Sequence, residues 1–194
     1  TGNKITFKGQ TYDIMGLLSP SNFISYENGE YRRQSFLVST GETITIEPDE
    51  WSEVTEVVIN QLDSTTALPQ GFLSNCPSLT SLTLTGLSNI RTISDNFLEG
   101  CISLSTLDLT PLTNLRTIGN NLLNECTNFT MIRLPIVTTT PTLGSWGSNI
   151  GQNNIVDAVT LNCGNDNNKE GYVLGSNWNT LVPGGTPTKY VRWI

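Results

Sequence analysis

Apolar residues recur along this chain at a fixed interval of 25 residues, which Cys76, Cys101 and Cys126 mark. The apolar columns with this interval are Phe72/Phe97/Leu122, Leu79/Leu104/Phe129, Leu82/Leu107/Ile132, Leu84/Leu109/Leu134, Leu87/Leu112/Val137 and Ile93/Ile118/Leu143. One interval earlier, Trp51 stands in the cysteine position, and Val54, Val57, Ile59, Leu62 and Leu68 fill the matching apolar positions. Such self-similarity predicts four repeats, over residues 46–70, 71–95, 96–120 and 121–145. A degraded fifth repeat, with Val159 and Leu161, follows.

Each repeat carries the pattern of one short strand and one shorter extended segment. "SLTSLTL" and "SLSTLDL" alternate leucine with polar residues, as a strand with one buried face does. "NIRTI" and "NLRTI" offer a second pair of inward residues, and Gly86 and Pro111 lie in the turns between the two segments. "GFLSNC" and "NFLEGC" are too short for a long helix, and predict one helical or 3₁₀ turn on the outer side.

No single repeat can cover its own apolar face, so the repeats must stack. The sequence therefore predicts an α/β-type solenoid dominated by β-structure, right-handed and built from 25-residue coils. Residues 1–45 alternate in the β manner, with a type I′ turn at Asn28-Gly29, and predict an N-terminal β cap. A separate attachment segment is the alternative. Residues 146–194 are expected to hold the degraded fifth repeat and an irregular C-terminal cap.

The repeat resembles that of a known family. "ISDNFLEGCISLSTLDL" and "IGNNLLNECTNFTMIRLP" are similar to the BspA-like leucine-rich repeats of surface proteins, from about Trp51 to Leu143. The C-terminal "GYVLGSNWNTLV" resembles that family's usual ending, whereas "PIVTTTPTLGSW" lacks the Asn-Leu-Arg segment of the earlier repeats. The resemblance implies a leucine-rich repeat fold and a role in adhesion or in binding varied host or matrix molecules.

Composition narrows the range of functions. The net charge is −7, with ten Lys and Arg against seventeen Asp and Glu, which argues against a nucleic-acid partner. The chain has no histidine, which excludes histidine-based catalytic pairs and histidine metal sites. No apolar run is long enough for a transmembrane segment. We expect no cofactor, no metal and an extracellular or cell-surface location, with an export signal removed from the chain.

The cysteine column admits a redox or metal role, but the spacing favours packing. Neighbouring coils lie about 4.8 Å apart, whereas disulfide Cβ atoms prefer about 3.8 Å with specific torsion angles. Three cysteines in one column also cannot all pair. We therefore expect Cys76, Cys101 and Cys126 to be buried free thiols, and Cys163 to be unpaired.

The outward positions of the main strands form the surface that solenoids commonly use for binding. Aligned on Leu82, the outward columns are Glu56/Ser81/Thr106/Met131 and Val58/Thr83/Asp108/Arg133, preceded by Thr55/Thr80/Ser105/Thr130. The candidate binding residues are Glu56, Ser81, Thr83, Thr106, Asp108, Met131 and Arg133. A plain solvated β face is the alternative interpretation. Among these residues, Glu56, Asp108 and Arg133 are expected to orient a partner.

Two further features have simple explanations. Arg91 and Arg116 recur in register and could pair with acidic neighbours or bind an anion, although plain solvation suffices. "DNNKEG" opens like a calcium loop, but Asn177 stands where the loop needs a bidentate glutamate. We therefore predict an Asn-rich turn there, without helices beside it.

Together these observations predict a non-enzymatic extracellular protein that binds a protein or glycan ligand through an exposed solenoid face. A structural or attachment protein of a virion is one alternative, so the source could be a bacterium or a virus. A carboxylate-dependent carbohydrate-active enzyme is the other alternative, because paired carboxylates need no histidine. Two carboxylates about 5–10 Å apart across one cleft would favour that enzyme.

Overall fold

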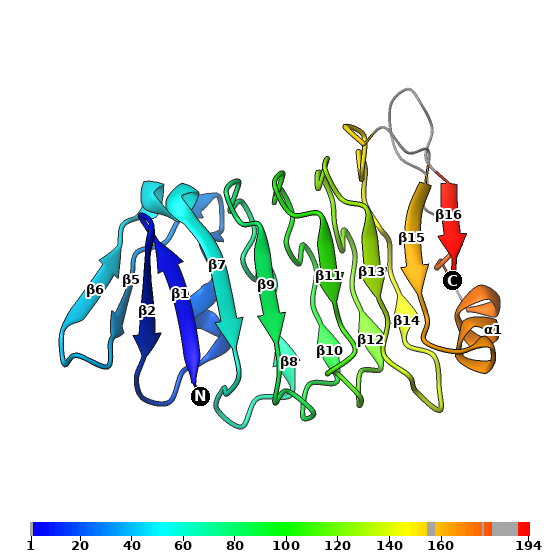
Figure 1. Cartoon of the computed structure of the whole chain (residues 1–194), viewed down its shortest axis with the longest axis horizontal. Coiled ribbons are helices and arrows are strands. Elements are labelled where there is room, and N and C mark those ends of the chain that lie inside the picture. The colour runs from blue at the N-terminus through cyan, green and yellow to red at the C-terminus, as the bar shows by residue number, and fades with distance from the viewer. Residues whose placement is uncertain (1, 155–157, 176, 180–189) are drawn as a thin grey trace.

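A computed structural model describes residues 2–154, 158–175, 177–179 and 190–194. The chain forms a β-solenoid whose coils stack along the long axis of the molecule (Figure 1). The residue ranges 46–70, 71–95, 96–120 and 121–145 are called coils 1 to 4 below.

The main strands of successive coils pair in parallel along one side of the solenoid. These strands are β7 (Val54–Ile59), β9 (Ser81–Leu84), β11 (Thr106–Asp108), β13 (Met131–Arg133), β15 (Ala158–Asn162) and β16 (Tyr190–Trp193). They fall into two ladders, because β9 pairs with β7, and β11 begins a second four-stranded sheet, β11-β13-β15-β16. β9 and β11 are nevertheless neighbours in the stack (Figure 1). The predicted "SLTSLTL"-type strands are confirmed.

A second, narrower sheet runs along the other side of the coils. Its strands are β8 (Ala67–Leu68), β10 (Thr92–Ile93), β12 (Thr117–Ile118) and β14 (Thr142–Leu143), all parallel. Residues 25 apart pair directly, as in Thr92 with Thr117 and Ile93 with Ile118. The "NIRTI" segments thus form the predicted second set of short strands.

The N-terminal segment extends the main sheet. β1 (Asn3–Phe7) and β2 (Gln10–Ile14) form a hairpin, and β1 pairs antiparallel with β7. Three further elements or pairs follow: the 3₁₀ helix η1 (Pro20–Phe23), the hairpin of β3 (Tyr26–Glu27) with β4 (Glu30–Tyr31), and the pair of β5 (Gln34–Leu37) with β6 (Thr43–Ile46). Asn28 and Gly29 both have positive φ, as the predicted type I′ turn requires.

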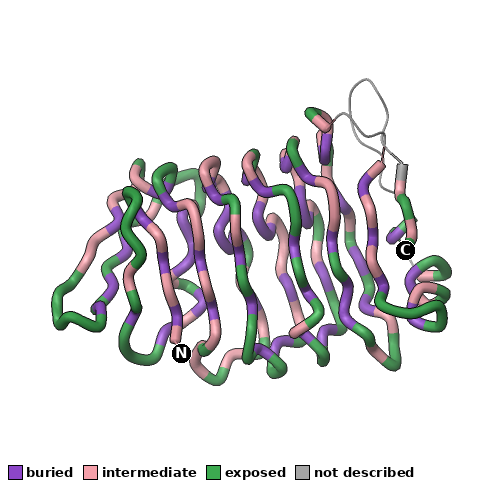
Figure 2. The backbone as a smooth tube through the Cα atoms, in the orientation of Figure 1, coloured by how far each residue is buried: buried purple, intermediate pink, exposed green. Residues whose placement is uncertain are grey.

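The core is a continuous apolar column between the two sheets (Figure 2). The columns that recur every 25 residues lie inside it, except that Leu62 and Val137 are only partly buried; Leu79, Leu104 and Phe129 are each 0% exposed. Phe97 packs on Phe72 with stacked rings whose centroids are 5.6 Å apart. The rings of Phe23, in the N-terminal segment, and Phe72 have centroids 5.9 Å apart, so that segment shares the same core.

The outer segments of coils 2 to 4 differ from the predicted helical turn. Coil 1 has a 3₁₀ helix there, η2 (Pro48–Glu53), but "GFLSNC" and "NFLEGC" form turns with positive φ at residues such as Leu73 and Leu98. This geometry directs backbone groups along the stack: the Leu98 N–H donates to the carbonyl of Phe72 at 3.1 Å, and the Gly100 N–H to that of Asn124 at 2.8 Å. Hydrogen bonds between coils therefore add to turn bonds within each coil, such as that from the Cys101 N–H to the carbonyl of Leu98 at 3.1 Å.

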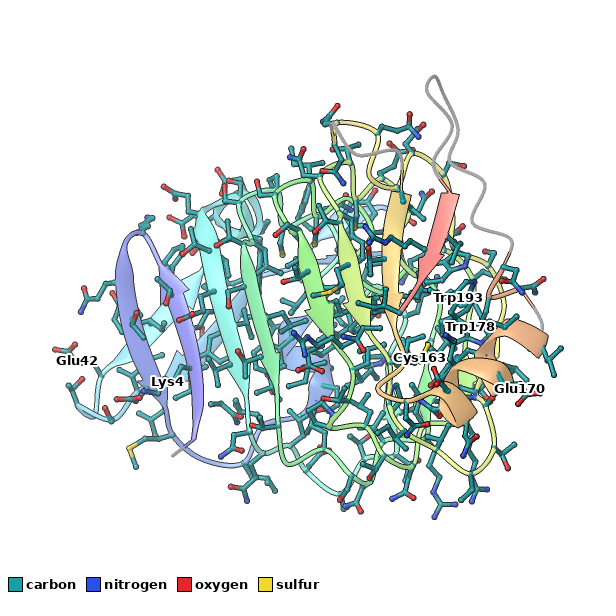
Figure 3. The ribbon with its side chains drawn as sticks, turned by 45° about the vertical axis from the view of Figure 1, so that its right-hand side comes forward. Lys4, Glu42, Cys163, Glu170, Trp178 and Trp193 are labelled. Carbon is teal, nitrogen blue, oxygen red and sulfur yellow. The ribbon has the colours of Figure 1, made fainter. Side chains whose placement is uncertain are left out.

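The C-terminal cap contains the helix α1 (Asp166–Leu174), whose N-cap Asn165 accepts from the Asn168 N–H. The prediction of an Asn-rich turn at "DNNKEG" is therefore wrong: these residues start a nine-residue helix. The rings of Tyr172 in α1 and Trp178 pack edge to face with centroids 5.0 Å apart, and the Trp178 indole donates to the carbonyl of Pro141 at 2.9 Å. Trp178 lies beside α1 at the C-terminal end of the molecule (Figure 3). The Asn-Trp segment thus covers the end of the core. The remainder of "GYVLGSNWNTLV" from residue 180 lies outside the described residues.

Candidate binding face

The outward residues of the main strands form one surface because side chains alternate along each strand. In β9, Leu82 and Leu84 are buried, and Ser81 and Thr83 point outward. We call the outward residues of β1, β2, β7, β9, β11, β13 and β15 the strand face.

The predicted columns are brought together by strand register. Glu56 pairs with Ser81 and Thr106 with Met131, while Asp108 pairs with Arg133. Val58 pairs with Thr83 in the same way. Each column continues from β9 to the neighbouring strand β11, although the described parts of these two strands are not paired by strand hydrogen bonds. Of the seven candidates, Thr83, Thr106, Asp108 and Arg133 are exposed, and Glu56, Ser81 and Met131 are partly buried.

The charged groups of the strand face differ in their local bonding. One oxygen of Asp108 accepts from the Thr110 N–H at 2.9 Å and from the Thr110 hydroxyl at 2.6 Å. Arg133 forms no ion pair with any described residue, although Asp108 is its neighbour across the ladder. Glu56 accepts a long hydrogen bond, 3.4 Å, from the Thr6 hydroxyl. Asp108 is therefore fixed by its own turn, whereas the Arg133 guanidinium is available to a ligand.

The threonines that precede the outward columns connect the coils. The hydroxyl of Thr80 donates to the carbonyl of Thr55 at 3.2 Å, and that of Thr130 to the carbonyl of Ser105 at 2.9 Å. These two hydroxyls each satisfy a carbonyl one coil earlier. Their local role is thus structural.

Sequence reasoning missed the part of this surface that lies outside the four repeats. In register with the predicted columns are Thr6, Thr11, Lys4 and Asp13 of the N-terminal hairpin and Thr160 and Asn162 of β15. Lys4 and Asp13 form an exposed ion pair of 3.4 Å. The alternation in "KITF" and "QTYD" was visible in the sequence, but the pairing of β1 with β7 was not.

The cysteine column is buried, and all four cysteines are free, as predicted. The Cys101 thiol donates to the carbonyl of Leu73 at 3.1 Å, and the Cys126 thiol to that of Leu98 at 3.2 Å. Burial raises the pKa of Cys76 and of Cys126 to about 12 and that of Cys163 to about 11. These buried thiols stay protonated, and those of Cys101 and Cys126 connect neighbouring coils, which is a packing role rather than a reactive one.

The protein is expected to lose stability between about pH 9 and pH 12. The unfolded thiols ionise near pH 9, whereas burial holds the pKa of Cys76 and Cys126 near 12 in the folded chain. A folded pKa above the unfolded one gives stability that is present below pH 9 and is lost as pH rises. Urea unfolding across this range measures the loss. A variant with alanine at Cys76, Cys101 and Cys126 should have a shallower decline; an unchanged slope would assign it to other groups.

No metal or membrane element is found in the part of the chain that the structure describes. There, no group of three or more histidine, cysteine, aspartate or glutamate residues could hold a metal ion. None of the described helices is long and apolar enough to cross a bilayer.

Comparison with known proteins agrees with this repeat architecture. The family model of the BspA type leucine rich repeat region matches residues 44–154 in 6 copies. No curated protein and no solved structure matches the chain.

Proposed function

Because the chain belongs to the BspA-type leucine-rich repeat family, we propose that it is a non-enzymatic extracellular or cell-surface protein that binds through its strand face. Its ligand is a protein or a glycan on another surface, and the outcome of binding is adhesion. The family suggests a surface or binding role and supports this location.

The contrast between inward and outward columns carries the proposal. The inward column Val57, Leu82, Leu107 and Ile132 is aliphatic throughout, since stacking requires an apolar side chain at each level. The outward column on the same strands reads Glu56, Ser81, Thr106 and Met131, and the next reads Val58, Thr83, Asp108 and Arg133. A repetitive core therefore carries a surface of mixed chemistry, which a solenoid can present as one extended recognition site.

The outward residues have distinct roles in this proposal. Arg133 supplies a cation that donates in a fork to a carboxylate or a similar acceptor. Asp108, already fixed by Thr110, presents its remaining acceptor positions in one orientation. Thr83 and Thr106 offer hydroxyls, and Ser81 and Glu56 further polar groups. Met131 supplies the flexible apolar contact.

The absence of catalysis is also part of the proposal. Glu27 and Glu99 line one cleft of about 310 Å³. However, Glu27 forms an ion pair with Arg32 at 3.2 Å, so one of these two carboxylates is already bound by a cation of the chain itself. Because the chain has no histidine, catalysis would need a pair of carboxylates, and this cleft is the less favoured candidate for the functional site.

A charge exchange on the strand face tests the proposal. In the variant D108R/R133E the two charges change places and the net charge stays the same. Bead-immobilised protein is incubated with a panel of purified matrix proteins and glycans, and bound material is quantified. We expect the exchange to reduce binding at least about tenfold, since it reverses both charge contacts.

The variant E27R/R32E is the matched control. It exchanges the charges of Glu27 and Arg32, which form an ion pair of 3.2 Å outside the strand face. Circular dichroism verifies that both variants are folded. Equal binding by D108R/R133E and the native chain would place recognition elsewhere, and a panel without any ligand would contradict the adhesive role.

A further inference from the structure

Coil 4 departs from coil 3 in the loop between its two strands. In coil 3 the Asn114 side chain donates to the carbonyl of Ser88 at 2.7 Å and thereby connects the loop to that of coil 2. The residue 25 positions later is Thr139, whose shorter side chain lacks the amide that makes this bond. Likewise, Leu115 is 2% exposed, but its counterpart is Thr140. The bond that connects neighbouring loops is thus lost between coils 3 and 4.

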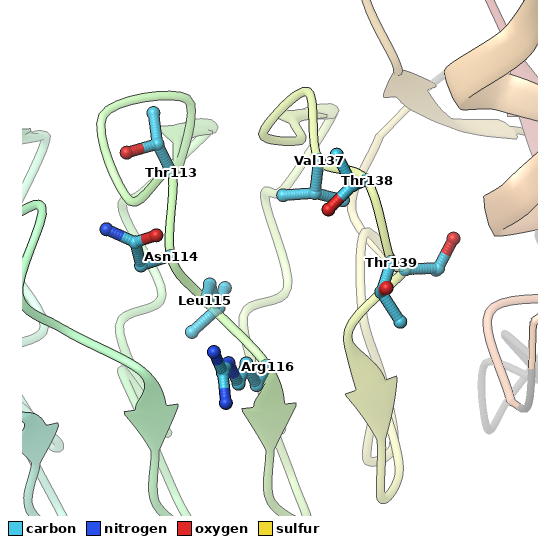
Figure 4. A pocket seen from close by; sticks show the side chains of 8 residues that line it. Thr113, Asn114, Leu115, Arg116, Val137, Thr138 and Thr139 are labelled. Atoms are coloured by element: carbon cyan, nitrogen blue, oxygen red, sulfur yellow. The ribbon is translucent and has the colours of Figure 1, made fainter.

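A groove lies where this connection is lost, between residues 110–116 of coil 3 and residues 133–140 of coil 4, and Asn162 and Gly164 lie at its edge. Two depressions form it, of about 330 Å³ and about 300 Å³, and both are lined by Thr113. Leu115, Arg116 and Val137 line the first (Figure 4). Arg133, Ile136 and Asn162 line the second, which adjoins the strand face.

The groove carries positive charge in an acidic protein. Neither Arg116 nor Arg133 forms an ion pair with a described residue, although the chain has a net charge of −7. Ion pairs engage five other cations: Lys4, Lys8, Arg32, Arg33 and Lys169. Asp166 lines an adjoining depression, but it is paired with Lys169 at 3.4 Å. Guanidinium groups without a carboxylate favour an anionic ligand, above all a carboxylate.

The remaining surface of the groove is aliphatic and hydroxylic. Ile136 is 59% exposed, Val137 is partly buried, and the threonines contribute methyl and hydroxyl groups. Among the described residues, no aromatic side chain lines either depression, so a sugar ring would find no ring to stack on there. Aliphatic side chains beside carboxylates fit this surface better.

We propose that this groove binds a short acidic peptide segment of a protein partner. Carboxylates of the segment contact Arg116 and Arg133, and an aliphatic side chain between them packs on Ile136 and Val137. This inference rests on the proposed function, because it specifies the chemistry of the partner. The binding site it concerns is the groove at the edge of the strand face.

The test uses a phage-displayed library of random dodecapeptides, selected on the native chain. The most enriched peptide and its counterpart with Gln and Asn for Glu and Asp are then synthesised, and their affinities are measured by fluorescence polarisation. We expect enrichment of Asp and Glu beside Leu, Ile or Val, and at least about tenfold weaker binding of the amide counterpart.

Arg91→Glu is the matched control for Arg116→Glu. Arg91 is the exposed residue one coil earlier, where the Asn114 bond connects the loops, and both variants change the charge equally. We expect R116E to weaken the peptide at least about tenfold and R91E less than about twofold. Equal effects of R116E and R91E would mean that the peptide is attracted by the overall charge of the protein and not by the groove, which would overturn the proposal. Selected peptides without acidic enrichment would also overturn it, as would a selection that enriches no peptide. Trigalacturonate is the further arm: tighter binding than the peptide, lost in R116E, would make the ligand a glycan and overturn it too.

These outcomes separate the groove from the strand face, because Arg116 lies outside that face. Failure of the peptide selection, together with reduced ligand binding in D108R/R133E, would remove the groove and leave the proposed function. Conversely, peptide binding could depend on Arg116 while D108R/R133E binds the ligand as well as the native chain does. That result would support the groove and contradict binding through the strand face.

Discussion

Replacing Phe97 with alanine should lower the free energy of unfolding by about 3–5 kcal/mol, the usual cost of such a cavity. Phe97 is 0% exposed and stacks on Phe72 of the preceding coil at 5.6 Å. Each coil of a solenoid contacts only its neighbours, so a cavity here weakens the interface on both sides. The total stability of a domain is about 5–15 kcal/mol, and the loss would be a large part of it.

Urea unfolding of the variant measures this loss, and Ile102→Ala is the control. Ile102 belongs to the same coil but is 44% exposed, so its truncation should change stability by less than about 1 kcal/mol. Similar losses in the two variants would mean that the stacked rings of Phe72 and Phe97 do not hold the coils together.

Replacing Trp178 with alanine should uncover the C-terminal end of the core, again at a cost of about 3–5 kcal/mol. The Trp178 indole is 0% exposed, donates to the carbonyl of Pro141 at 2.9 Å, and packs edge to face on Trp146 at 5.5 Å. Because coils interact with their neighbours alone, the effect should be concentrated at that end. Amides of β13, β15 and α1 should therefore exchange with deuterium faster, while those of β1 and β7 change much less.

Trp193→Ala provides the comparison for this prediction. Trp193 lies near the same end, but it is only partly buried and its indole donates to Asn179 at 3.0 Å. We expect a smaller acceleration of exchange than in Trp178→Ala. Uniformly faster exchange along the whole chain in Trp178→Ala would contradict a stack of coils that interact only pairwise.

The sequence predicted the solenoid because the 25-residue interval reports directly on burial. Leu82, Leu107 and Ile132 recur at that interval because each packs on its counterparts in the adjacent coils, and the confirmed parallel register pairs Leu82 with Val57 and Leu107 with Ile132. The buried free thiols followed from the same reasoning. The family match over residues 44–154 confirms the resemblance.

Other features depended on interactions that no local pattern contains. The positive φ of Leu73 and Leu98 is unfavourable for leucine alone, and it is stabilised by hydrogen bonds between coils. The helix α1 was missed because "DNNKEG" has poor helix propensity. It is held instead by tertiary contacts, such as the Tyr172 hydroxyl donating to the carbonyl of Pro135 at 2.9 Å.

The candidate site was predictable to a more limited extent. Alternation within each strand placed Thr83 and Asp108 outward, but it could not reveal that Asp108 is bound by Thr110. The groove was only hinted at by the altered "PIVTTTPTLGSW" segment. Its shape depends on whether a side chain connects two neighbouring loops. Asn114 of coil 3 makes this connection, and Thr139 at the equivalent position of coil 4 does not. The binding role of the seven strand-face residues stays a prediction.

Oxidation of the two methionines, with any ligand that the matrix panel yields, tests recognition through the strand face most directly. Met131 lies on that face, and Met15, which is 49% exposed beyond β2, is a control within the same chain. Hydroxyl-radical labelling with mass spectrometry gives both oxidation rates. The account predicts that bound ligand slows oxidation of Met131 several-fold and leaves Met15 unchanged. An unchanged rate at Met131 under saturating ligand would contradict it.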